Sequence, residues 1–356
     1  MAYTTVDKPA LYNSSKLWTG TGAENAITGV GFQPDFVWIK QRDFTRNHNE
    51  FDAIRGATKR LYPDLTNAEE TAAQVLKSFD SDGFTLGTDT SANANTGTYV
   101  AWNWKMNGAG SSNGNGSITS TVSVDTTAKQ SIVKYTGTGS NATIGHGLGV
   151  APNAIFVKSL ASANWAVYAS EAGHHTGSGN LGPTKYLSLN LDGVEASATD
   201  MWYDTAPTTT VFSTGGATMS GASAQEYIAY CFAKNSGYFD TGIYRGIGSA
   251  TGPVVYTGFR PSIIICKKIT GTAAPWLIYD ESRLGYNRND TANGNNPLYC
   301  NTDAAEITTR QLDIFWNGFQ IRNTDGDGNN NNSKYVYFAW AKNPLVASND
   351  NVANSR

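Results

Sequence analysis

Several features that commonly point to a function are scarce in this sequence. Its 356 residues include only three cysteines, which form neither a CxxC pair nor an even set for disulfide bonds. Cys231, Cys266 and Cys300 are therefore predicted to be small buried thiols in a protein that folds in a reducing cytoplasm. No apolar run approaches the ~20 residues needed to cross a bilayer, and the N-terminus lacks the apolar stretch of a signal peptide. We expect no membrane insertion.

Charge is equally scarce. Only 15% of the residues are charged, and 26 Lys and Arg face 29 Asp and Glu, which gives a formal net charge of −3. No basic stripe or acidic tail is present, and this argues against nucleic acid as a partner. A chain rich in Gly, Thr, Asn and Ser with few charges favours β-structure with many turns over a helical bundle.

The sequence does contain a threefold repeat. The segment YVAWNWK at residues 99–105 returns as YIAYCFAK at 227–234 and as YVYFAWAK at 335–342. We call these copies the closing segments. Each follows a proline segment, which reads GFQPDFVWIK, GVAPNAIFVK or GFRPSIIICK. The copies lie roughly 110 to 130 residues apart, which suits one domain per repeat.

These spacings predict three tandem domains. A Gly/Ser/Asn-rich stretch is predicted to be a flexible linker after the first, whereas the second and third are joined closely and should move together. The final residues lack apolar anchors and are predicted to be disordered without a partner. The predicted division is repeat 1 at 1–106, the linker at 107–117, repeat 2 at 118–235, repeat 3 at 236–344 and the tail at 345–356.

Alternation of side chains predicts what the segments do. In the first closing segment Val100, Trp102 and Trp104 share one face, which we expect to be a core wall, while the other face is mostly small. The proline segments are apolar on both faces and should form central strands. We expect each repeat to hold its own core, so that Trp102 and Trp340 each stabilise only their own repeat.

The expected fold class is all-β, with three antiparallel β-sandwiches of jelly-roll kind and long loops. Asp82-Gly83 and Asn317-Gly318 are residue pairs that favour a type I′ hairpin turn. The best helix candidate is NAEETAAQVLKSF at residues 67–79, with Asn67 as its cap.

Two acid–base pairs are the first candidates for chemistry. Asp52 and Arg55, and likewise Asp280 and Arg283, are three residues apart, so that a cation could tune the pKa of an acid. Repeat 2 has no arginine at the matching place. Ion pairs in turns are common, and we favour a structural role for both. A carboxylate pair for glycoside hydrolysis is an alternative that the sequence does not support.

Metal sites are weakly indicated. Asp325, Asp327 and Asn329 have the alternate spacing of a calcium loop, but Asn330 and Val336 stand where such a loop needs glycine and glutamate. A solvated hairpin loop is the favoured interpretation, with calcium left open.

Histidines and glycines add no site. His146 lies in one loop and the pair His174 and His175 in another, so no set of three or four ligands is indicated. The glycine-rich stretch GTGSNATIGHGLG at 137–149 lacks the Lys-Ser/Thr ending of a phosphate loop and is read as a β-turn segment. The sequence thus predicts no catalytic, cofactor-binding or metal-binding residue.

Long segments resemble a known family. The opening MAYTTVDKPA, the run TGTGAENAITGVGFQPDFVWIKQRD, the closing segment YVAWNWK and the ending NPLVASNDNVANSR are similar to virion proteins of marine tailed bacteriophages. The resemblance covers essentially the whole chain. It implies a repeated β-rich domain of unknown function and a place in the phage particle, often under the label of tail-fibre or virion structural protein. It supplies no catalytic residues.

The expected function is accordingly non-enzymatic. We expect a virion structural protein, assembled in the host cytoplasm and exposed on the particle as a tail appendage that contacts the host. A capsid-decorating protein is the main alternative, and a tail enzyme that degrades polysaccharide is a further one. The expected partners are other virion proteins, further copies of the chain, with a trimer favoured, and a host surface glycan. No cofactor is expected.

Loops before the closing segments differ between repeats and are the expected contact surfaces. They span residues 88–98, 213–226 and 323–334. Tyr286 and Trp202 are aromatic residues near them that could stack on a sugar or a partner protein, although core packing is the favoured role for Trp202.

Overall fold

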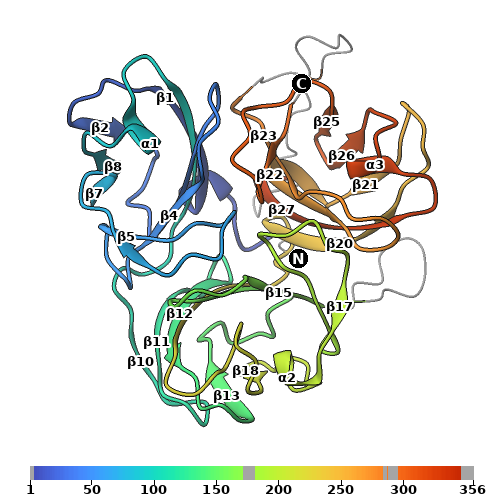
Figure 1. Cartoon of the computed structure of the whole chain (residues 1–356). Helices are drawn as coiled ribbons and strands as arrows, with labels where there is room; N and C mark the ends of the chain where they lie inside the picture. The colour runs from blue at the N-terminus through green and yellow to red at the C-terminus, as the bar shows by residue number, and fades with distance from the viewer. Residues whose placement is uncertain (1–3, 171–180, 284–286, 288–295, 346–356) are drawn as a thin grey trace.

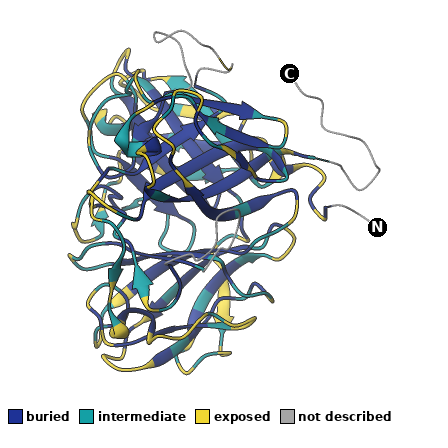
Figure 2. Ribbon diagram, turned by 90° about the vertical axis from the view of Figure 1, so that its right-hand side faces the viewer, coloured by how far each residue is buried: buried dark blue, intermediate teal, exposed yellow. Residues whose placement is uncertain are grey.

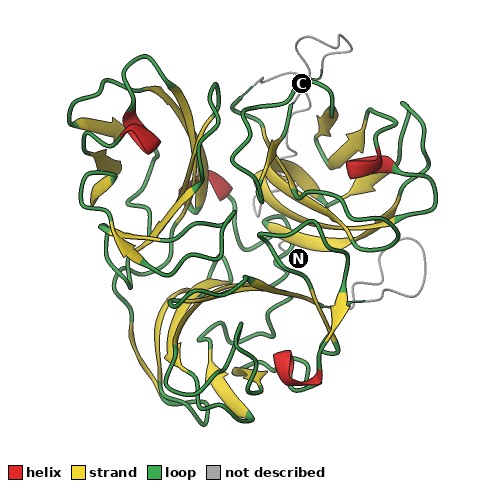
Figure 3. Cartoon of the chain, viewed as in Figure 1, coloured by secondary structure: helices red, strands yellow, loops and turns green. Residues whose placement is uncertain are grey.

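The computed structural model describes residues 4–170, 181–283, 287 and 296–345 (Figure 1). In this part of the chain 27 strands are joined by three single-turn α-helices and one 3-10 helix, and every pair of these strands is antiparallel (Figure 3). The all-β prediction is confirmed. Among these residues no helix has the length and apolar character that a membrane crossing requires.

Repeat 1 forms a four-stranded sheet in the order β1-β9-β3-β4, a three-stranded sheet β2-β8-β7 and a small pair β5-β6. The bounds are β1 Asn13–Thr19, β2 Asn25–Thr28, β3 Phe36–Gln41, β4 Asn49–Asp52, β5 Lys59–Arg60, β6 Glu70–Thr71, β7 Leu76–Asp80, β8 Gly83–Leu86 and β9 Thr98–Trp104.

Repeat 2 forms a six-stranded sheet β10-β11-β12-β19-β14-β15 and the pairs β13-β18 and β16-β17. The bounds are β10 Ser111–Asn113, β11 Ser120–Asp125, β12 Gln130–Thr136, β13 Ala142–Gly145, β14 Ala154–Ser159, β15 Ala166–Ala169, β16 Lys185–Tyr186, β17 Ala196–Ser197, β18 Val211–Thr214 and β19 Glu226–Phe232.

Repeat 3 forms a five-stranded sheet β20-β27-β22-β23-β24 and a three-stranded sheet β21-β26-β25. The bounds are β20 Phe239–Arg245, β21 Val254–Tyr256, β22 Phe259–Lys268, β23 Leu277–Asp280, β24 Leu298–Tyr299, β25 Leu312–Phe315, β26 Gly318–Ile321 and β27 Lys334–Pro344. The four helices are η1 Pro9–Leu11, α1 Thr90–Asn93, α2 Thr199–Trp202 and α3 Gly326–Asn329.

The three large sheets share one plan. The closing segments form β9, β19 and β27, each hydrogen-bonded on both sides. The proline segments form β3, β14 and β22, which lie between the closing strand and a further strand, so the prediction of central strands is confirmed. Both faces of these strands are buried, which matches their continuous apolar sequence.

One face of each large sheet packs on the smaller sheet of the same repeat. In repeat 1 the core between them contains Tyr99 and Ala101 of β9 with Ile27 of β2 and Phe84 of β8. Corresponding cores join β19 to β13 and β18, and β27 to β21, β25 and β26. The small residues of the closing strands face this layer, because they let the second sheet approach closely.

The other face of each large sheet packs against the other two repeats around a common centre (Figures 1 and 2). Trp340 shows this directly, since its ring centroid lies 5.3 Å from Trp104 of repeat 1 and 5.0 Å from Phe232 of repeat 2. The expectation that Trp102 and Trp340 pack only within their own repeats is therefore wrong, since Trp102 also donates to Asp280 of repeat 3. All three closing strands contribute aromatic residues to the central core: Trp102, Trp104, Tyr230, Phe232, Phe338 and Trp340.

Two further expectations are corrected. The stretch 67–79 is not a helix, because Val75 and Leu76 are buried in the core of repeat 1 and the chain forms β6 and β7 instead. Local helix propensity yields there to sheet packing. Residues 111–113 of the predicted linker form β10, which pairs with β11. The predicted disordered tail at 345–356 lies outside the described residues apart from Leu345.

Both expected hairpins form, with loops shifted by one residue from the predicted turn. Gly83 and Gly318 are the first paired residues after loops Ser81-Asp82 and Trp316-Asn317. A Cβ on either glycine would come within about 2 Å of a backbone oxygen of the neighbouring strand, at Ile27 or Val255. Glycine is thus required here by the close approach of that strand.

Trp340→Ala should lower the free energy of unfolding of the whole chain by about 3 to 5 kcal/mol, because the cavity opens in a core that all three repeats share. Calorimetry should show one transition for the wild type and one, at lower temperature, for the variant. The matched control is Phe44→Ala, which truncates an exposed aromatic residue and should leave melting unchanged. A variant that lost only one of several separate transitions would contradict a shared core.

Candidate functional site

Polar side chains gather where the repeats meet, and the same arrangement recurs at each junction. Lys40, Lys158 and Lys267 end the three proline segments and are fully buried. Each amine donates to a carbonyl oxygen of another repeat, at distances of 3.2, 3.4 and 2.7 Å, and also to carbonyl oxygens of its own repeat. The inter-repeat acceptors are Asp303, Thr66 and Asp192 respectively. Desolvation lowers the pKa of these lysines to about 8, 7 and 8.

A second set of hydrogen bonds joins the repeats, in which a ring nitrogen of tryptophan or histidine donates to a carbonyl oxygen of another repeat. Trp165 Nε1 donates to the carbonyl of Tyr62, and Trp276 Nε1 donates to that of Ser188, both at 2.9 Å. His48 Nε2 lies 2.8 Å from the carbonyl oxygen of Tyr299. Because Nδ1 of His48 accepts from the Trp38 indole at 2.8 Å, Nε2 must carry the proton. The three bonds run from repeat 2 to 1, from 3 to 2 and from 1 to 3, and so close a cycle.

Backbone pairing adds a third cyclic set. The amides of Glu69, Glu195 and Glu306 donate to carbonyl oxygens of the neighbouring repeat at 2.9, 3.4 and 2.8 Å. The acceptors are Leu160, Ile269 and Arg42, each two residues after one of the buried lysines. The junctions are thus defined by hydrogen bonds as well as by apolar packing.

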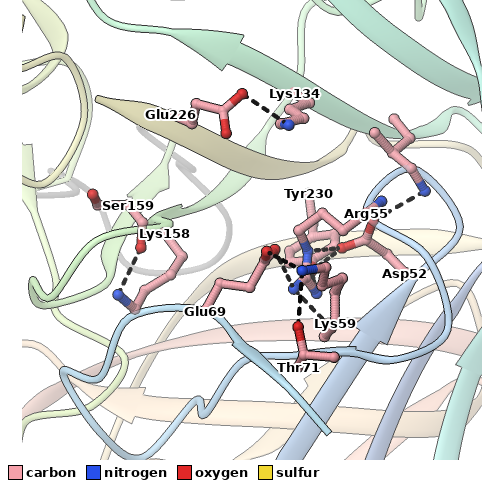
Figure 4. Close-up of polar contacts among 11 residues, drawn as sticks. Asp52, Arg55, Lys59, Glu69, Thr71, Lys134, Lys158, Ser159, Glu226 and Tyr230 are labelled. Atoms are coloured by element: carbon pink, nitrogen blue, oxygen red, sulfur yellow. Dashed lines mark hydrogen bonds and ion pairs between the residues drawn. The ribbon is translucent and has the colours of Figure 1, made fainter. Parts of the chain in front are cut away.

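The pair Asp52 and Arg55 lies at the junction of repeats 1 and 2 (Figure 4). Arg55 Nε donates to Asp52 Oδ2 at 2.5 Å, and both side chains are 0% exposed. Tyr230 of repeat 2 donates its hydroxyl to the same Asp52 oxygen at 2.9 Å, and Glu69 Oε2 lies 3.4 Å from Arg55. The predicted local ion pair is confirmed, and its partner across the junction is new.

The pair Asp280 and Arg283 takes the equivalent place between repeats 3 and 1. Its atoms are 2.6 Å apart and also fully buried, and the Trp102 indole donates to Asp280 at 2.9 Å. At the third junction the equivalent positions hold Phe338 and Ala169, both apolar and both in the central core. The aspartate is therefore absent at the junction where the facing aromatic residue, a phenylalanine, has no hydrogen-bond donor.

These clusters suit adhesion between repeats and not catalysis. A substrate could not reach the two ion pairs, because the side chains of all four residues are fully buried: Asp52, Arg55, Asp280 and Arg283. A buried carboxylate that accepts from both a guanidinium and a hydroxyl or indole is fully engaged. Sequence spacing identified the i,i+3 pairs, but their donors Tyr230 and Trp102 lie 178 residues away along the chain.

Glu50 is an unusual acid in the central core. It is 1% exposed, and Oε2 has no hydrogen-bond partner among the described residues. It lines a cavity of about 20 Å³ walled mostly by aromatic side chains, which has room for one water molecule and nothing larger. Burial raises the pKa of Glu50 well above its usual value of 4.5. Val167 and Ile278 occupy the equivalent positions of repeats 2 and 3.

The calcium candidate is engaged by an arginine. Arg310 Nε lies 2.8 Å from Asp325 Oδ1 and 3.1 Å from Asp327 Oδ2. Asp325 also caps α3 by accepting from the Asp327 amide at 2.8 Å, and Asn329 is buried with its side chain bonded to backbone groups. Within the described ranges no group of three or more potential ligands could hold a metal ion.

The remaining candidates are mostly structural. His146 is buried, and burial lowers its pKa to about 4. Trp202 is buried as favoured, with Nε1 donating to the Lys185 carbonyl. His174, His175 and Tyr286 lie outside the described residues. The glycine-rich stretch 137–149 was read as a β-turn segment, but its centre forms the strand β13, which pairs with β18. The thiols of Cys231, Cys266 and Cys300 are buried and free, and burial raises their pKa.

A tyrosine holds each of the three divergent loops. The hydroxyls of Tyr99, Tyr227 and Tyr335, which begin the closing segments, donate to a loop carbonyl at 2.9, 2.9 and 2.7 Å. Each hydroxyl also accepts a hydrogen bond from a loop amide, at 2.8, 2.9 and 2.7 Å. The three loops thus differ in sequence but are fastened to the sheet in the same way.

A known family matches almost the whole chain. Residues 8–344 match a family described as a domain of unknown function, DUF7483. The chain belongs to the DUF7483 family. No curated protein matches it. The match spans all three repeats, so the DUF7483 domain corresponds to the complete interlocked arrangement and not to one sandwich.

Asp52→Ala should cost about 3 to 5 kcal/mol of folding free energy, because it leaves the Arg55 guanidinium buried without its main partner. The double variant Asp52→Ala/Arg55→Met should regain part of this loss. Denaturant unfolding at pH 7 measures both. Lys134→Ala is the matched control, since it breaks an exposed ion pair with Glu226 and should cost less than about 1 kcal/mol. Equal effects of Asp52→Ala and the control would refute the junction role.

Glu50→Val should stabilise the chain at pH 8 by about 1 kcal/mol or more, since each unit of raised pKa is worth ~1.4 kcal/mol. The folded state binds the Glu50 proton more tightly than the unfolded state. Wild-type stability should therefore fall as the pH rises above 4.5 towards the raised folded pKa. Denaturant midpoints from pH 4 to pH 9 measure this, with the exposed Glu24→Gln as control. Parallel profiles for the wild type and Glu50→Val would contradict it.

Proposed function

We propose that this DUF7483 protein is a non-enzymatic structural protein of a bacteriophage virion, exposed on the particle and in contact with the host cell. The main support for the proposal is that the polar residues that could do chemistry instead join the repeats. The candidates for chemistry at Asp52, Arg55, Asp280 and Arg283 are all buried at junctions, where they hold the repeats together.

The architecture supports a scaffold role. Three sandwiches interlocked through a common core form a rigid body, and rigid bodies present contact surfaces without loss of conformational freedom on binding. The resemblance of long sequence segments to phage virion proteins supports the setting. We expect assembly into a homo-oligomer, with a trimer favoured.

A binding experiment with two readouts tests the role. Purified protein is incubated with host cells and with extracted surface polysaccharide, and retention and product release are both followed. Retention without release is the expected result. Reducing sugar that accumulates with turnover would replace the proposal with a polysaccharide-degrading enzyme.

Location on the particle is tested by labelling intact virions with antibody and gold. Label at the tail is expected. A ring of label on the capsid, together with no retention by host cells, would assign capsid decoration instead. Light scattering of the purified protein tests the oligomer, and a monomer at micromolar concentration with no larger species on particles would reject it.

A further inference from the structure

Repeat 3 exposes aromatic side chains on the outer face of its small sheet. Along β21, Val255 is buried in the core while Val254 and Tyr256 are exposed, Tyr256 by 48% of its surface. Tyr256 pairs with Gly318, and Gly318 pairs on its other side with Phe315, so the three residues form a row across the sheet. Since Gly318 has no side chain, the sheet surface is recessed between Tyr256 and Phe315.

Trp316 follows Phe315 directly along the chain. It is the first residue of the two-residue loop between β25 and β26 and is 40% exposed. Figure 1 shows β21, β25 and β26 on the side of repeat 3 away from the centre of the molecule. We call Tyr256, Phe315, Trp316 and Gly318 the aromatic row.

Repeat 1 shows that the fold does not require these residues. Its equivalent row has the same pairing, with Thr28, Gly83 and Asp80 across the sheet and Ser81 in the loop. The glycine is retained because its neighbour strand approaches closely, but the three aromatic positions carry short polar residues. The pairing thus does not need the aromatic residues, and their clustering in repeat 3 points to an interaction site.

A cleft begins at the same tyrosine. Tyr256 lines a hollow of about 440 Å³ together with Thr257, Gly258, Lys234 and Asp240, a volume in the range of small-ligand sites. Lys234 and Asp240, which both line it, form an ion pair of 3.0 Å. The rest of the lining is Asn235, Ser236, Gly237, Phe239 and Leu345, so the walls of the cleft are both polar and apolar. Tyr256 therefore belongs both to the aromatic row and to this cleft.

Size and charge select the occupant. Three strands of about four residues give a face of about 10 by 13 Å, or ~130 Å², whereas a standard protein partner covers ~800 Å². The charged side chains nearby are already paired within the protein, Lys234 with Asp240 and Arg322 with Asp313 at 3.2 Å. A small, uncharged ligand with both apolar and hydroxyl surface fits this description.

We propose that the aromatic row binds a neutral saccharide, with a sugar ring stacked on Tyr256 or Trp316 and adjoining hydroxyl groups beside the polar side chains of the cleft, such as Asn235 and Thr257. The C–H face of a pyranose ring is apolar and slightly positive, and it complements the negative face of an aromatic ring. The inference rests on the proposed host contact and names the ligand class for it.

Titration calorimetry tests the site with a panel of neutral hexasaccharides built from glucose, galactose, mannose or N-acetylglucosamine. The wild type should bind at least one member, and at least one of Tyr256→Ala and Trp316→Ala should weaken that binding tenfold or more. Thr28→Ala and Ser81→Ala alter the equivalent row of repeat 1 and should leave binding unchanged. All four residues are exposed, so melting temperatures should stay at the wild-type value.

Retention on host cells separates the two proposals. If the wild type and both aromatic variants are retained equally, the host contact stands and the saccharide row is wrong. If a saccharide binds through Tyr256 but cells retain nothing, the row stands and the host contact is wrong. No binding to any hexasaccharide, or retention that protease treatment of the cells abolishes, would also overturn the saccharide assignment.

Discussion

A lysine amine in a protein interior needs hydrogen-bond acceptors, and this requirement ties the three repeats together. Lys40, Lys158 and Lys267 are each the next-to-last residue of a central strand, and each donates to a carbonyl oxygen in a loop of another repeat. An isolated repeat would leave these amines without that acceptor and would expose the aromatic face of its large sheet. The sandwiches are therefore parts of one folding unit, although each has a core of its own between its two sheets.

The strands could be predicted because their sequences fix them locally. Apolar runs bounded by proline gave the central strands, and alternation placed Trp102 and Trp104 on one face. Alternation states which residues share a face but not what lies against that face, so the shared core was not predictable. The stretch with Val75 and Leu76 failed as a helix because the partner strand β8, which decides its structure, is read only from tertiary pairing.

The polar sites divide in the same way. The ion pairs of Asp52 and Asp280 follow from an i,i+3 spacing, whereas Tyr230 and Trp102 meet them only through the fold. The sequence did contain one sign of this pairing. Repeat 2 has Ala169 in place of the aspartate, and the aromatic residue that faces it, Phe338, has no hydrogen-bond donor. The aromatic row was likewise visible as Tyr256 and Trp316 against Thr28 and Ser81, once the repeats are compared position by position.

The cyclic order of the junctions has a consequence for how this protein can change over generations. In a trimer of identical chains every substitution would appear at all three junctions at once, so an acid would have to suit every facing ring. Here the three junctions are encoded separately. One holds Asp52 with Tyr230, one holds Asp280 with Trp102, and the third has Ala169 and Phe338 at the same positions. Because the repeats are joined in one polypeptide, all three keep the same backbone plan. The side chains at each junction and on each outer surface can nevertheless change independently of the other two.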